Sequence, residues 1–299
     1  MDRTFSRIGM RLKAFRLEQD WAVEKIAEHL GVSRAAVYRI ESGEIIKIDT
    51  LFHLAKLFGT TVAALLESGV EYYAQASDYF ERMREIEGES DQIIASFPPF
   101  SYLLTTNHYA QDFRTMLLEM LSGCEQEKSL FIKEIDKVID ILERRKITQK
   151  RRNMSVINFV SFLELERWLQ LGVIGRFDLS ETILHERRKA TYREIENLLH
   201  IVESEPMGIQ IGFVREMLPN TSFQLFRTSE KTYLGVSPFR LGGELPNIQN
   251  GIAMITADQE PVGLYEKMVQ KLWEEAVKGR EAALVLKQIL KRSGISSGL

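Results

Sequence analysis

Arg34 and Arg39 follow the tripeptide Gly31-Val32-Ser33, and guanidinium groups at this spacing can make paired hydrogen bonds. On an exposed helix, each could donate two hydrogen bonds to a guanine in the major groove of DNA. Gly31 allows the left-handed backbone that a tight turn between two helices needs. Ser33 is a good N-cap for the helix that follows. The sequence therefore indicates two short helices joined by a tight turn, the second one carrying both arginines.

The exposed face of this second helix would present Arg34, Ala35, Tyr38 and Arg39. Tyr38 could touch a base or a phosphate, and Ala35 or Ala36 could meet a thymine methyl group. Ser33 and Ser42 are placed for phosphate contacts, which position a protein on DNA without specifying a sequence. Val32 is expected to bury against the first helix pair. This arrangement is that of a helix-turn-helix.

Three stretches carry a resemblance to a known family, namely IGMRLKAFR, KIAEHLGVSRAAVYRIESG and LFHLAKLFGTTVAALL. Through them, residues 8–66 resemble the Xre/Cro/CI family of bacterial and phage repressor DNA-binding domains. The resemblance implies a bundle of five short helices that binds operator DNA, usually as a homodimer. It implies that Arg34, Ala35 and Arg39 touch base edges. It also implies an ion pair between Arg16 and Glu41.

One position departs from this family. Its members commonly have Thr-Gln at the start of the second helix, where this sequence has Ala22-Val23. The change removes a helix cap, worth about 1 kcal/mol, and an expected phosphate contact. A single copy of this head is therefore expected to bind DNA weakly, which makes a dimer more necessary. At the fifth helix, Thr61 is the expected cap.

Composition limits the class of protein. The chain has 299 residues, with 39 basic and 42 acidic side chains and a formal net charge of −3. That length predicts about two domains. No segment has the basic excess of a non-specific nucleic-acid binder, and the acidic stretch at 70–99 should face away from phosphate. Cys124 is the only cysteine, which excludes cysteine-ligated clusters and intrachain disulfides and fits a reducing cytoplasm.

We expect a multi-domain chain with an all-α five-helix head at residues 1–68 and a helical linker at 69–89. Residues 90–299 would form a larger α/β or α+β domain for effector binding and dimerisation. The linker carries an apolar stripe, formed by Tyr72, Ala76, Tyr79, Phe80 and Met83. Such a stripe either packs on its own chain or forms a dimerisation helix. The sequence leaves both interpretations open.

In residues 90–299, strands separated by helices and then a run of strands favour an α/β or α+β domain. Strands are expected at 92–97, 156–162, 209–214, 222–228, 231–236 and 252–256. Helices are expected at 107–122, 127–147, 163–171, 180–203, 259–277 and 280–292.

The stretch IAMITADQEPVGLYEKMVQKLWEEA, at 252–276, combines a strand, an acidic turn and a helix. With it, residues 90–292 loosely resemble the phospholipase-D-like fold of some transcription-factor effector domains. The catalytic form of that fold needs His-x-Lys-x4-Asp, and none of the five histidines has lysine two positions later. Phosphodiester hydrolysis by that mechanism is therefore excluded. The sequence also has no G-x-S-x-G, no P-loop and no helical His pair for a metal. We expect no enzyme activity, cofactor or metal.

Ligands favour the carboxyl ends of strands in open α/β sheets. Four residues at expected strand ends are therefore candidates for effector binding: Ser96, Phe97, Thr228 and Arg240. Two basic clusters, at 144–152 and 187–193, have two interpretations. They are solvated helix ends, or they form an anion site or an auxiliary DNA contact.

Together these observations predict a cytoplasmic, sequence-specific DNA-binding transcriptional regulator. It would be a homodimer whose C-terminal domain senses a small-molecule effector. Its partners would be double-stranded operator DNA, a second copy of the chain and that effector, with no membrane. Two alternatives stay open. One is a DNA-tethered enzyme or a nucleotide- or phosphate-binding protein, and the other is an antitoxin-like protein-interaction module.

Overall fold

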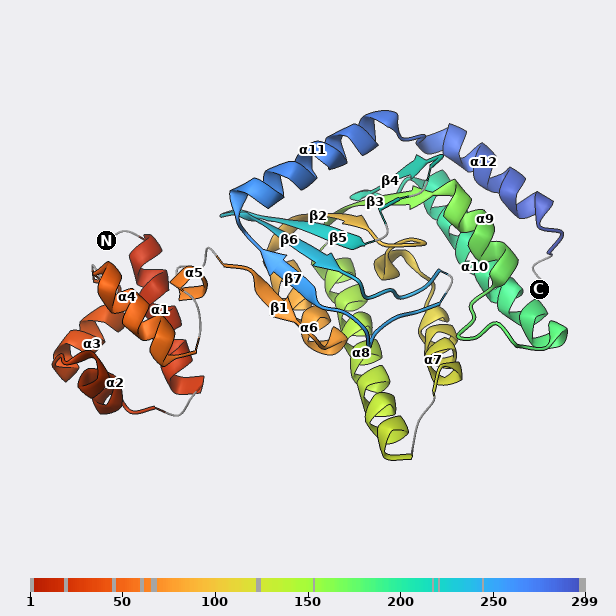
Figure 1. Ribbon diagram of the computed structural model, residues 1–299. Coiled ribbons are helices and arrows are strands. Elements are labelled where there is room, and N and C mark those ends of the chain that lie inside the picture. The colour runs from red at the N-terminus through yellow and green to blue at the C-terminus, as the bar shows by residue number, and fades with distance from the viewer. Residues whose placement is uncertain are drawn as a thin grey trace. The chain divides into compact units, whose positions relative to one another are not determined.

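The computed structural model (Figure 1) describes residues 3–18, 21–44, 47–59, 62–65, 69–121, 125–152, 154–216, 218–219, 221–243 and 245–295. The chain divides into two compact units. The first comprises residues 1–71 with 256–258, and the second comprises residues 72–255 with 259–299. The predicted end of the head at residue 68, the expected cap Thr61 and Cys124 lie outside the described residues.

The head contains five helices within its described residues: α1 (Arg3–Glu18), α2 (Val23–Leu30), α3 (Arg34–Glu41), α4 (Ile48–Leu57) and α5 (Val62–Leu65). This agrees with the predicted five-helix bundle. Helices α2 to α5 have only four to ten residues each, so none would be stable alone in water. They are held by one hydrophobic cluster, to which the five helices contribute Leu12, Ile26, Val37, Leu54 and Leu65 in turn.

The turn between α2 and α3 has the backbone that the sequence predicts. Gly31 adopts φ = 63°, in the left-handed region that a side chain disfavours. Ser33 caps α3, because its Oγ accepts a hydrogen bond from the Ala36 N–H at 3.2 Å. The burial expected of Val32 is not found. That side chain is 37% exposed, whereas Val37, with 2% exposed, is buried in the core of the head.

The second unit is built on a seven-stranded mixed sheet with the order β1-β7-β6-β5-β2-β3-β4. The strands are β1 (Glu71–Tyr73), β2 (Ser90–Ser96), β3 (Ser155–Ser161), β4 (Ile209–Val214), β5 (Ser222–Thr228), β6 (Thr232–Ser237) and β7 (Ala253–Thr256). Strands β2, β3 and β4 are parallel neighbours, whereas β5 runs antiparallel to both β2 and β6. Strands β4 and β5 begin and end at the predicted residues. Strand β1 was not predicted and lies in the expected linker.

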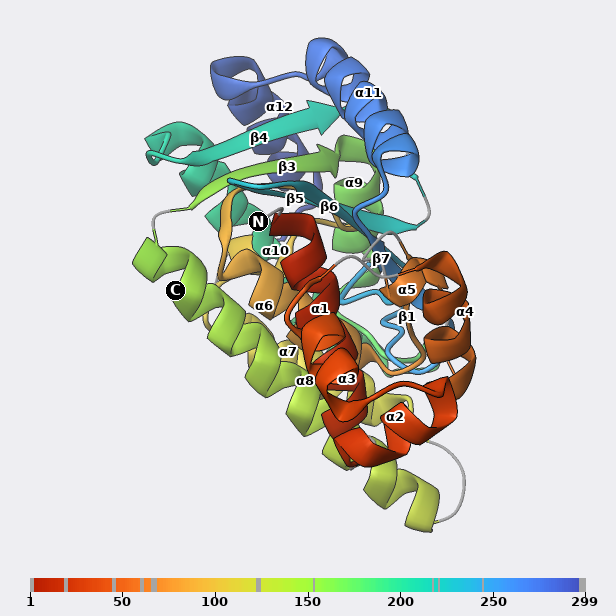
Figure 2. The ribbon, with the colours of Figure 1, turned by 90° about the vertical axis from the view of Figure 1, so that its left-hand side faces the viewer.

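Helices cover the two faces of this sheet unequally. Six helices share the larger hydrophobic cluster with one face: α6 (Ala76–Glu87), α7 (Tyr109–Glu119), α8 (Glu125–Arg152), α9 (Phe162–Leu171), α10 (Glu181–Ser204) and α12 (Gly279–Arg292). Helix α11 (Gln259–Glu275) packs on the other face through Val262 and Val269. Figure 2 shows the long helix α8 running beside α6 and α7. Adjacent residues such as Ile93 and Ile94 belong to opposite clusters, as strand alternation requires.

Helix α6 is part of the second unit rather than a separate linker. Its side chains Ala76, Tyr79, Phe80 and Met83 are fully buried in the larger cluster. Tyr72, the first member of the expected stripe, is instead exposed and lies in β1. The structure therefore agrees with the first interpretation, in which the stripe packs on its own chain. This burial leaves no apolar stripe on α6 for dimerisation, and the second unit starts before the predicted boundary at residue 90.

Gly9 marks a close crossing of α1 and the end of α3. A methyl group on Gly9 would lie 2.6 Å from the carbonyl oxygen of Glu41 and from the nitrogen of Gly43. We expect Gly9→Ala to push the two helices apart and to lower the free energy of unfolding of the head by about 1–3 kcal/mol. Hydrogen exchange, followed by mass spectrometry on the full chain, should become faster in the helices of the head, α1 and α3 included, and stay unchanged in the second unit.

Gly263, in α11, supplies the matched control for this change. A methyl group added there meets no atom within 4 Å, so Gly263→Ala should not accelerate exchange anywhere. Unchanged protection of α1 and α3 in Gly9→Ala would contradict the close crossing.

Candidate functional site

A buried ion pair fixes the position of α3. The guanidinium group of Arg16, in α1, donates to both carboxylate oxygens of Glu41 at 2.6 and 3.1 Å. It also donates to the carbonyl oxygen of Trp21 at 3.0 Å. The hydrogen bonds to Glu41 raise the pKa of Arg16. The pair that the family resemblance implies thus joins α1, the last residue of α3 and the segment before α2.

Helix α3 presents its predicted face to solvent. The side chains of Arg34 and Arg39 are 68% and 63% exposed, and Ala35 and Tyr38 between them are exposed as well. Ala36 is half-buried. Of the two alanines considered for a thymine contact, Ala35 is therefore the more accessible.

The two serines of the predicted interface lie at opposite ends of α3. Ser33 uses its oxygen as an acceptor for the Ala36 N–H, so its hydroxyl proton remains free to be donated. Ser42 instead donates its hydroxyl proton to the carbonyl oxygen of Arg39 at 2.8 Å. A phosphate oxygen can only accept, so Ser33 is better prepared than Ser42 for a phosphate contact.

Each arginine of the exposed face has a carboxylate neighbour that the sequence analysis did not find. Arg34 Nη1 donates to Glu24 Oε1, in α2, at 2.9 Å. Arg39 Nε lies 3.7 Å from Glu44 Oε2. The hydrogen bond from Arg34 lowers the pKa of Glu24. Exposed pairs of this kind add little stability, but they orient the guanidinium groups. The pair of Arg34 and Glu24 joins the helices on either side of the turn, and no local spacing in the sequence predicts it.

The start of α2 lacks the side-chain cap that is common in the family that the head resembles. Ala22 occupies the N-cap position with extended backbone and makes no side-chain hydrogen bond. Only the Lys25 N–H reaches its carbonyl oxygen, at 3.1 Å. The departure noted in the sequence is therefore a real difference in how the helix begins.

Comparison with known families agrees with this geometry. Residues 12–65 match a family model described as helix-turn-helix. This segment is a helix-turn-helix domain of the Xre/Cro/CI type. It favours DNA binding as the role of the head. No curated protein matches the sequence, and the phospholipase-D-like resemblance of residues 90–292 rests on the sequence pattern alone. Among the helices of the described residues, none has the length and apolar character needed to cross a membrane.

The four candidate effector residues do not come together in the second unit. Because β5 runs antiparallel to β2, Ser90 lies opposite Thr228 and Ser96 lies opposite Phe223. Ser96 and Thr228 are therefore at opposite ends of the sheet, about 20 Å apart for six residues of extended chain. The prediction of one site that contains both is wrong, since the sequence does not reveal the direction of β5.

The local roles of these residues also differ. Ser96 and Phe97 are buried, with Phe97 in the larger hydrophobic cluster and the Ser96 hydroxyl without a hydrogen-bond partner in the described structure. Thr228 Oγ1 donates to the carbonyl oxygen of Lys231 at 2.9 Å and so stabilises the turn between β5 and β6. Arg240 is exposed, and its backbone pairs with that of Asn247.

Glu164 is a perturbed carboxyl group that the sequence analysis missed. It follows the carboxyl end of β3, where Ser161 caps α9 by accepting the Glu164 N–H at 3.3 Å. Burial raises the pKa of Glu164 to about 7, and a backbone hydrogen bond from Leu218 opposes this only in part. Ser-x-x-Glu is the spacing of a capping box, so the sequence did carry a signal. A perturbed group at a strand end is a candidate for function.

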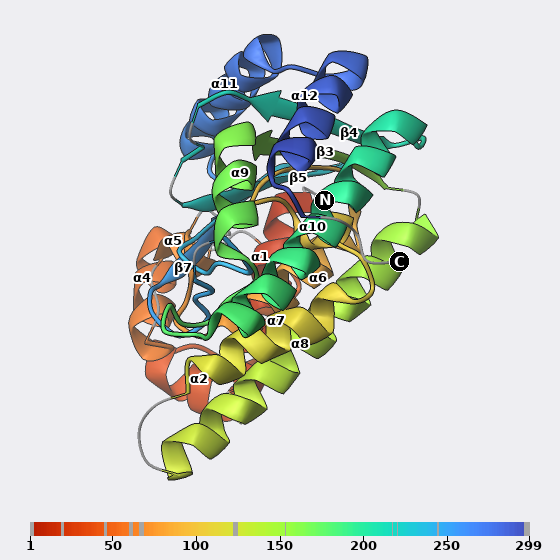
Figure 3. The same ribbon diagram turned by 90° about the vertical axis from the view of Figure 1, so that its right-hand side faces the viewer.

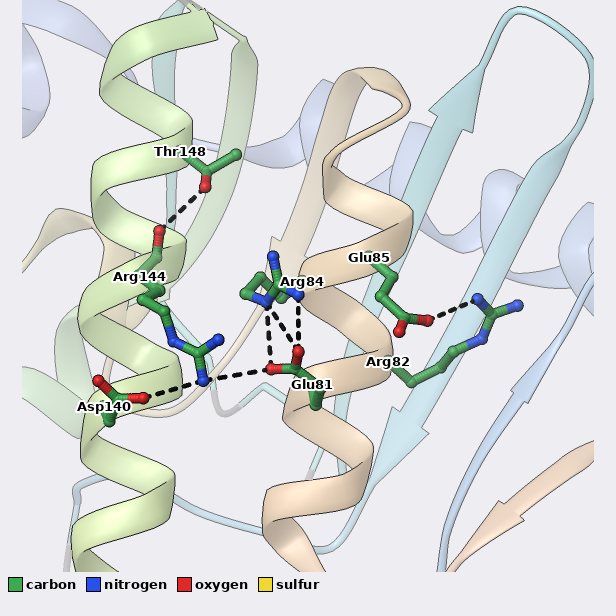
Figure 4. Close-up of polar contacts among 7 residues, drawn as sticks. All are labelled: Glu81, Arg82, Arg84, Glu85, Asp140, Arg144 and Thr148. Atoms are coloured by element: carbon green, nitrogen blue, oxygen red, sulfur yellow. Dashed lines mark hydrogen bonds and ion pairs between the residues drawn. The ribbon is translucent and has the colours of Figure 1, made fainter. Parts of the chain in front are cut away.

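Residues of the basic cluster at 144–152 bind acids and carbonyls of the second unit. Figure 4 shows Arg144 of α8 between Asp140, at 2.9 Å, and Glu81 of α6, at 3.6 Å. Glu81 also accepts hydrogen bonds from Arg84. The acidic stretch at 70–99 and this basic cluster therefore neutralise each other across two packed helices.

Three residues of the second basic cluster also bind carboxylates: Arg187 binds Glu119, Lys189 binds Glu186 and Arg193 binds Asp112. Burial raises the pKa of Asp112, and Arg193 counteracts that increase. Arg188 makes both kinds of contact, because its Nε donates to the carbonyl oxygen of Gln170 at 2.7 Å and its Nη1 lies 3.6 Å from Glu181 Oε2. Most of this cluster is thus structural.

The raised pKa of Glu164 predicts a pH-dependent stability. A carboxyl group whose folded pKa lies above its usual value of 4.5 favours folding when protonated, and this contribution is lost as the pH rises through about 7. We therefore expect Glu164→Gln to raise the free energy of unfolding at pH 8 by about 1–2 kcal/mol, after allowance for partial exposure. At pH 4.5 the change should be close to zero.

Urea denaturation in a Trp21→Phe background would measure this, since Trp168 and Trp273 then report on the second unit. An equal effect of Glu164→Gln at both pH values would contradict the raised pKa.

Proposed function

We propose that the protein is a sequence-specific DNA-binding transcriptional regulator that reads its operator with α3. The observation that carries this proposal is the exposed face of α3, where Arg34 and Arg39 stand on a helix fixed by the buried pair of Arg16 and Glu41. Each guanidinium group can bind O6 and N7 of a guanine, worth about 1–3 kcal/mol of discrimination. Ser33 would donate to a phosphate oxygen.

The proposal includes a homodimer. The recognition helices of a dimer contact half-sites about 34 Å apart. A single head with an uncapped α2 and carboxylates beside both arginines has little phosphate attraction of its own. Two linked heads bind more tightly than one without any new type of contact. The second unit would hold the two copies together.

The proposal also gives the second unit a sensing role. A small-molecule effector would favour one spacing of the two heads, since an effector with equal affinity for both arrangements shifts nothing. Catalysis forms no part of this proposal, because the sequence lacks the His-x-Lys-x4-Asp motif that the resembling catalytic fold requires.

Removal of both arginines tests the reading helix. We expect Arg34→Ala/Arg39→Ala to weaken binding to an operator fragment by about 30-fold or more, since each guanidinium contributes about 1–3 kcal/mol. Fluorescence polarisation on DNA from the protein's own promoter would measure it, over a salt series with unrelated DNA as competitor.

A matched control removes two other exposed charges of the head, Lys13 in α1 and Lys56 in α4. Lys13→Ala/Lys56→Ala should weaken binding to operator and to unrelated DNA by the same factor, because exposed charges away from α3 attract phosphate without reading the sequence. Unaltered affinity in the double arginine variant would exclude α3 as the reading helix. If the wild-type protein binds its promoter no better than competitor DNA, the proposal of a sequence-specific regulator is overturned.

Glu24 tests whether its pair with Arg34 matters for specificity. Glu24→Gln removes a negative charge that repels phosphate and frees Arg34 from its partner at 2.9 Å. We expect the affinity for unrelated DNA to rise severalfold, while the ratio of operator to unrelated affinity falls. Glu28→Gln, one turn further along α2, makes the same charge change away from this pair. If both variants change the ratio equally, Glu24 acts only through its charge and does not position Arg34.

A further inference from the structure

A cavity of about 680 Å³ lies among α9, α10 and α12 in the second unit. Figure 3 shows these three helices side by side. Small-molecule sites in proteins commonly have volumes of about 300–1,000 Å³. The apolar side chains of its lining are Leu169 and Ile289, which are both almost fully buried, and Ile295.

Two guanidinium groups from different helices stand at its rim. Arg188 of α10 is oriented by the hydrogen bond from its Nε to the carbonyl oxygen of Gln170, at 2.7 Å. Its Nη1 lies 3.6 Å from the exposed carboxylate of Glu181. Arg292, in the last turn of α12, forms no hydrogen bond or ion pair with any residue that the structure describes. The lining therefore contains one guanidinium group that is partly engaged and a second one without a partner among the described residues.

The helix ends explain only part of this arrangement. Helices α9 and α12 end beside the cavity, and cations are favoured near the carbonyl groups of a helix C-terminus. This accounts for a positive charge at each end, but not for the cavity between them.

The charge of the lining indicates the charge of the ligand. Arg188 and Arg292 are opposed by one lining carboxylate, Glu166. The arginine and acidic side chains of the lining therefore carry one net positive charge. A ligand with a single negative charge balances it, and a planar carboxylate matches the fork of a guanidinium group.

We propose that this cavity binds an organic monocarboxylate with an apolar body. Arg188 and Arg292 would hold the carboxylate, while Leu169, Ile289 and Ile295 would cover the apolar body. This inference names a ligand class for the effector role and rests on the proposed function in that respect. Binding itself does not depend on DNA, so the two can fail separately.

Calorimetry on the full chain without DNA tests the site, with octanoate as the probe and octanamide as its neutral counterpart. We expect saturable octanoate binding that is about tenfold tighter than octanamide binding, and a loss of about tenfold or more in Arg188→Gln/Arg292→Gln. Lys291→Gln, next to Arg292 but outside the cavity lining, should bind as the wild type does. Glu166→Gln should bind octanoate severalfold more tightly, because it removes the opposing charge.

Absence of saturable octanoate binding, equal binding of octanamide, or unchanged affinity in the double variant would each overturn the proposal. Arg188→Gln also loses the bond to Gln170, so thermal melting must accompany it. If it destabilises the fold, Arg292→Gln alone decides, since that side chain has no described partner. Octanoate binding of the expected kind with no effect on operator affinity would support the binding site and overturn the effector role of this cavity.

Discussion

A buried ion pair between Arg145 of α8 and Glu87 of α6 joins the two helices that pack along the sheet of the second unit. Their side chains are 3% and 1% exposed, and the shorter of the two hydrogen bonds is 2.6 Å. Gln224 of β5 donates to the same carboxylate at 3.0 Å, so the pair also reaches the sheet. Loss of either partner would leave a buried charge uncompensated, at a cost of about 3–5 kcal/mol. The pair thus fastens α6 to the second unit, which begins at residue 72.

This ion pair also shows where prediction from the sequence stops. Alternating and continuous apolar runs predicted β4 and β5 to the residue, because strand periodicity is a local property. The acidic stretch and the basic cluster were each recognised, but their contact joins residues 58 positions apart along the chain. No local pattern reports such a pairing. The sequence analysis therefore assigned the helix at 76–87 to a linker, whereas in the structure other elements of the same chain cover its apolar side.

The candidate sites divide in the same way. Gly31, Ser33 and the exposed face of α3 follow from local backbone chemistry, and the structure places them as the sequence indicated. Glu24 was missed because its contact with Arg34 depends on how two helices cross. Ser96 and Thr228 were wrongly grouped because strand ends can be predicted, while strand direction cannot. A parallel β5 would have put both at the same edge. The antiparallel register puts them at opposite edges.

The charges of the head constrain how it could act on DNA. Phosphate attraction scales with the number of cations that displace counterions, and here both arginines of α3 have carboxylates within 4 Å. Binding to arbitrary DNA is then weak, because part of each arginine's charge is offset locally. Base contacts are less affected, since they depend on hydrogen-bond geometry more than on net charge. Such a head has low affinity but keeps its discrimination, and linking two copies raises the affinity for a site with two half-sites. In the proposed homodimer, that linkage would come from the second unit, which has its own hydrophobic core.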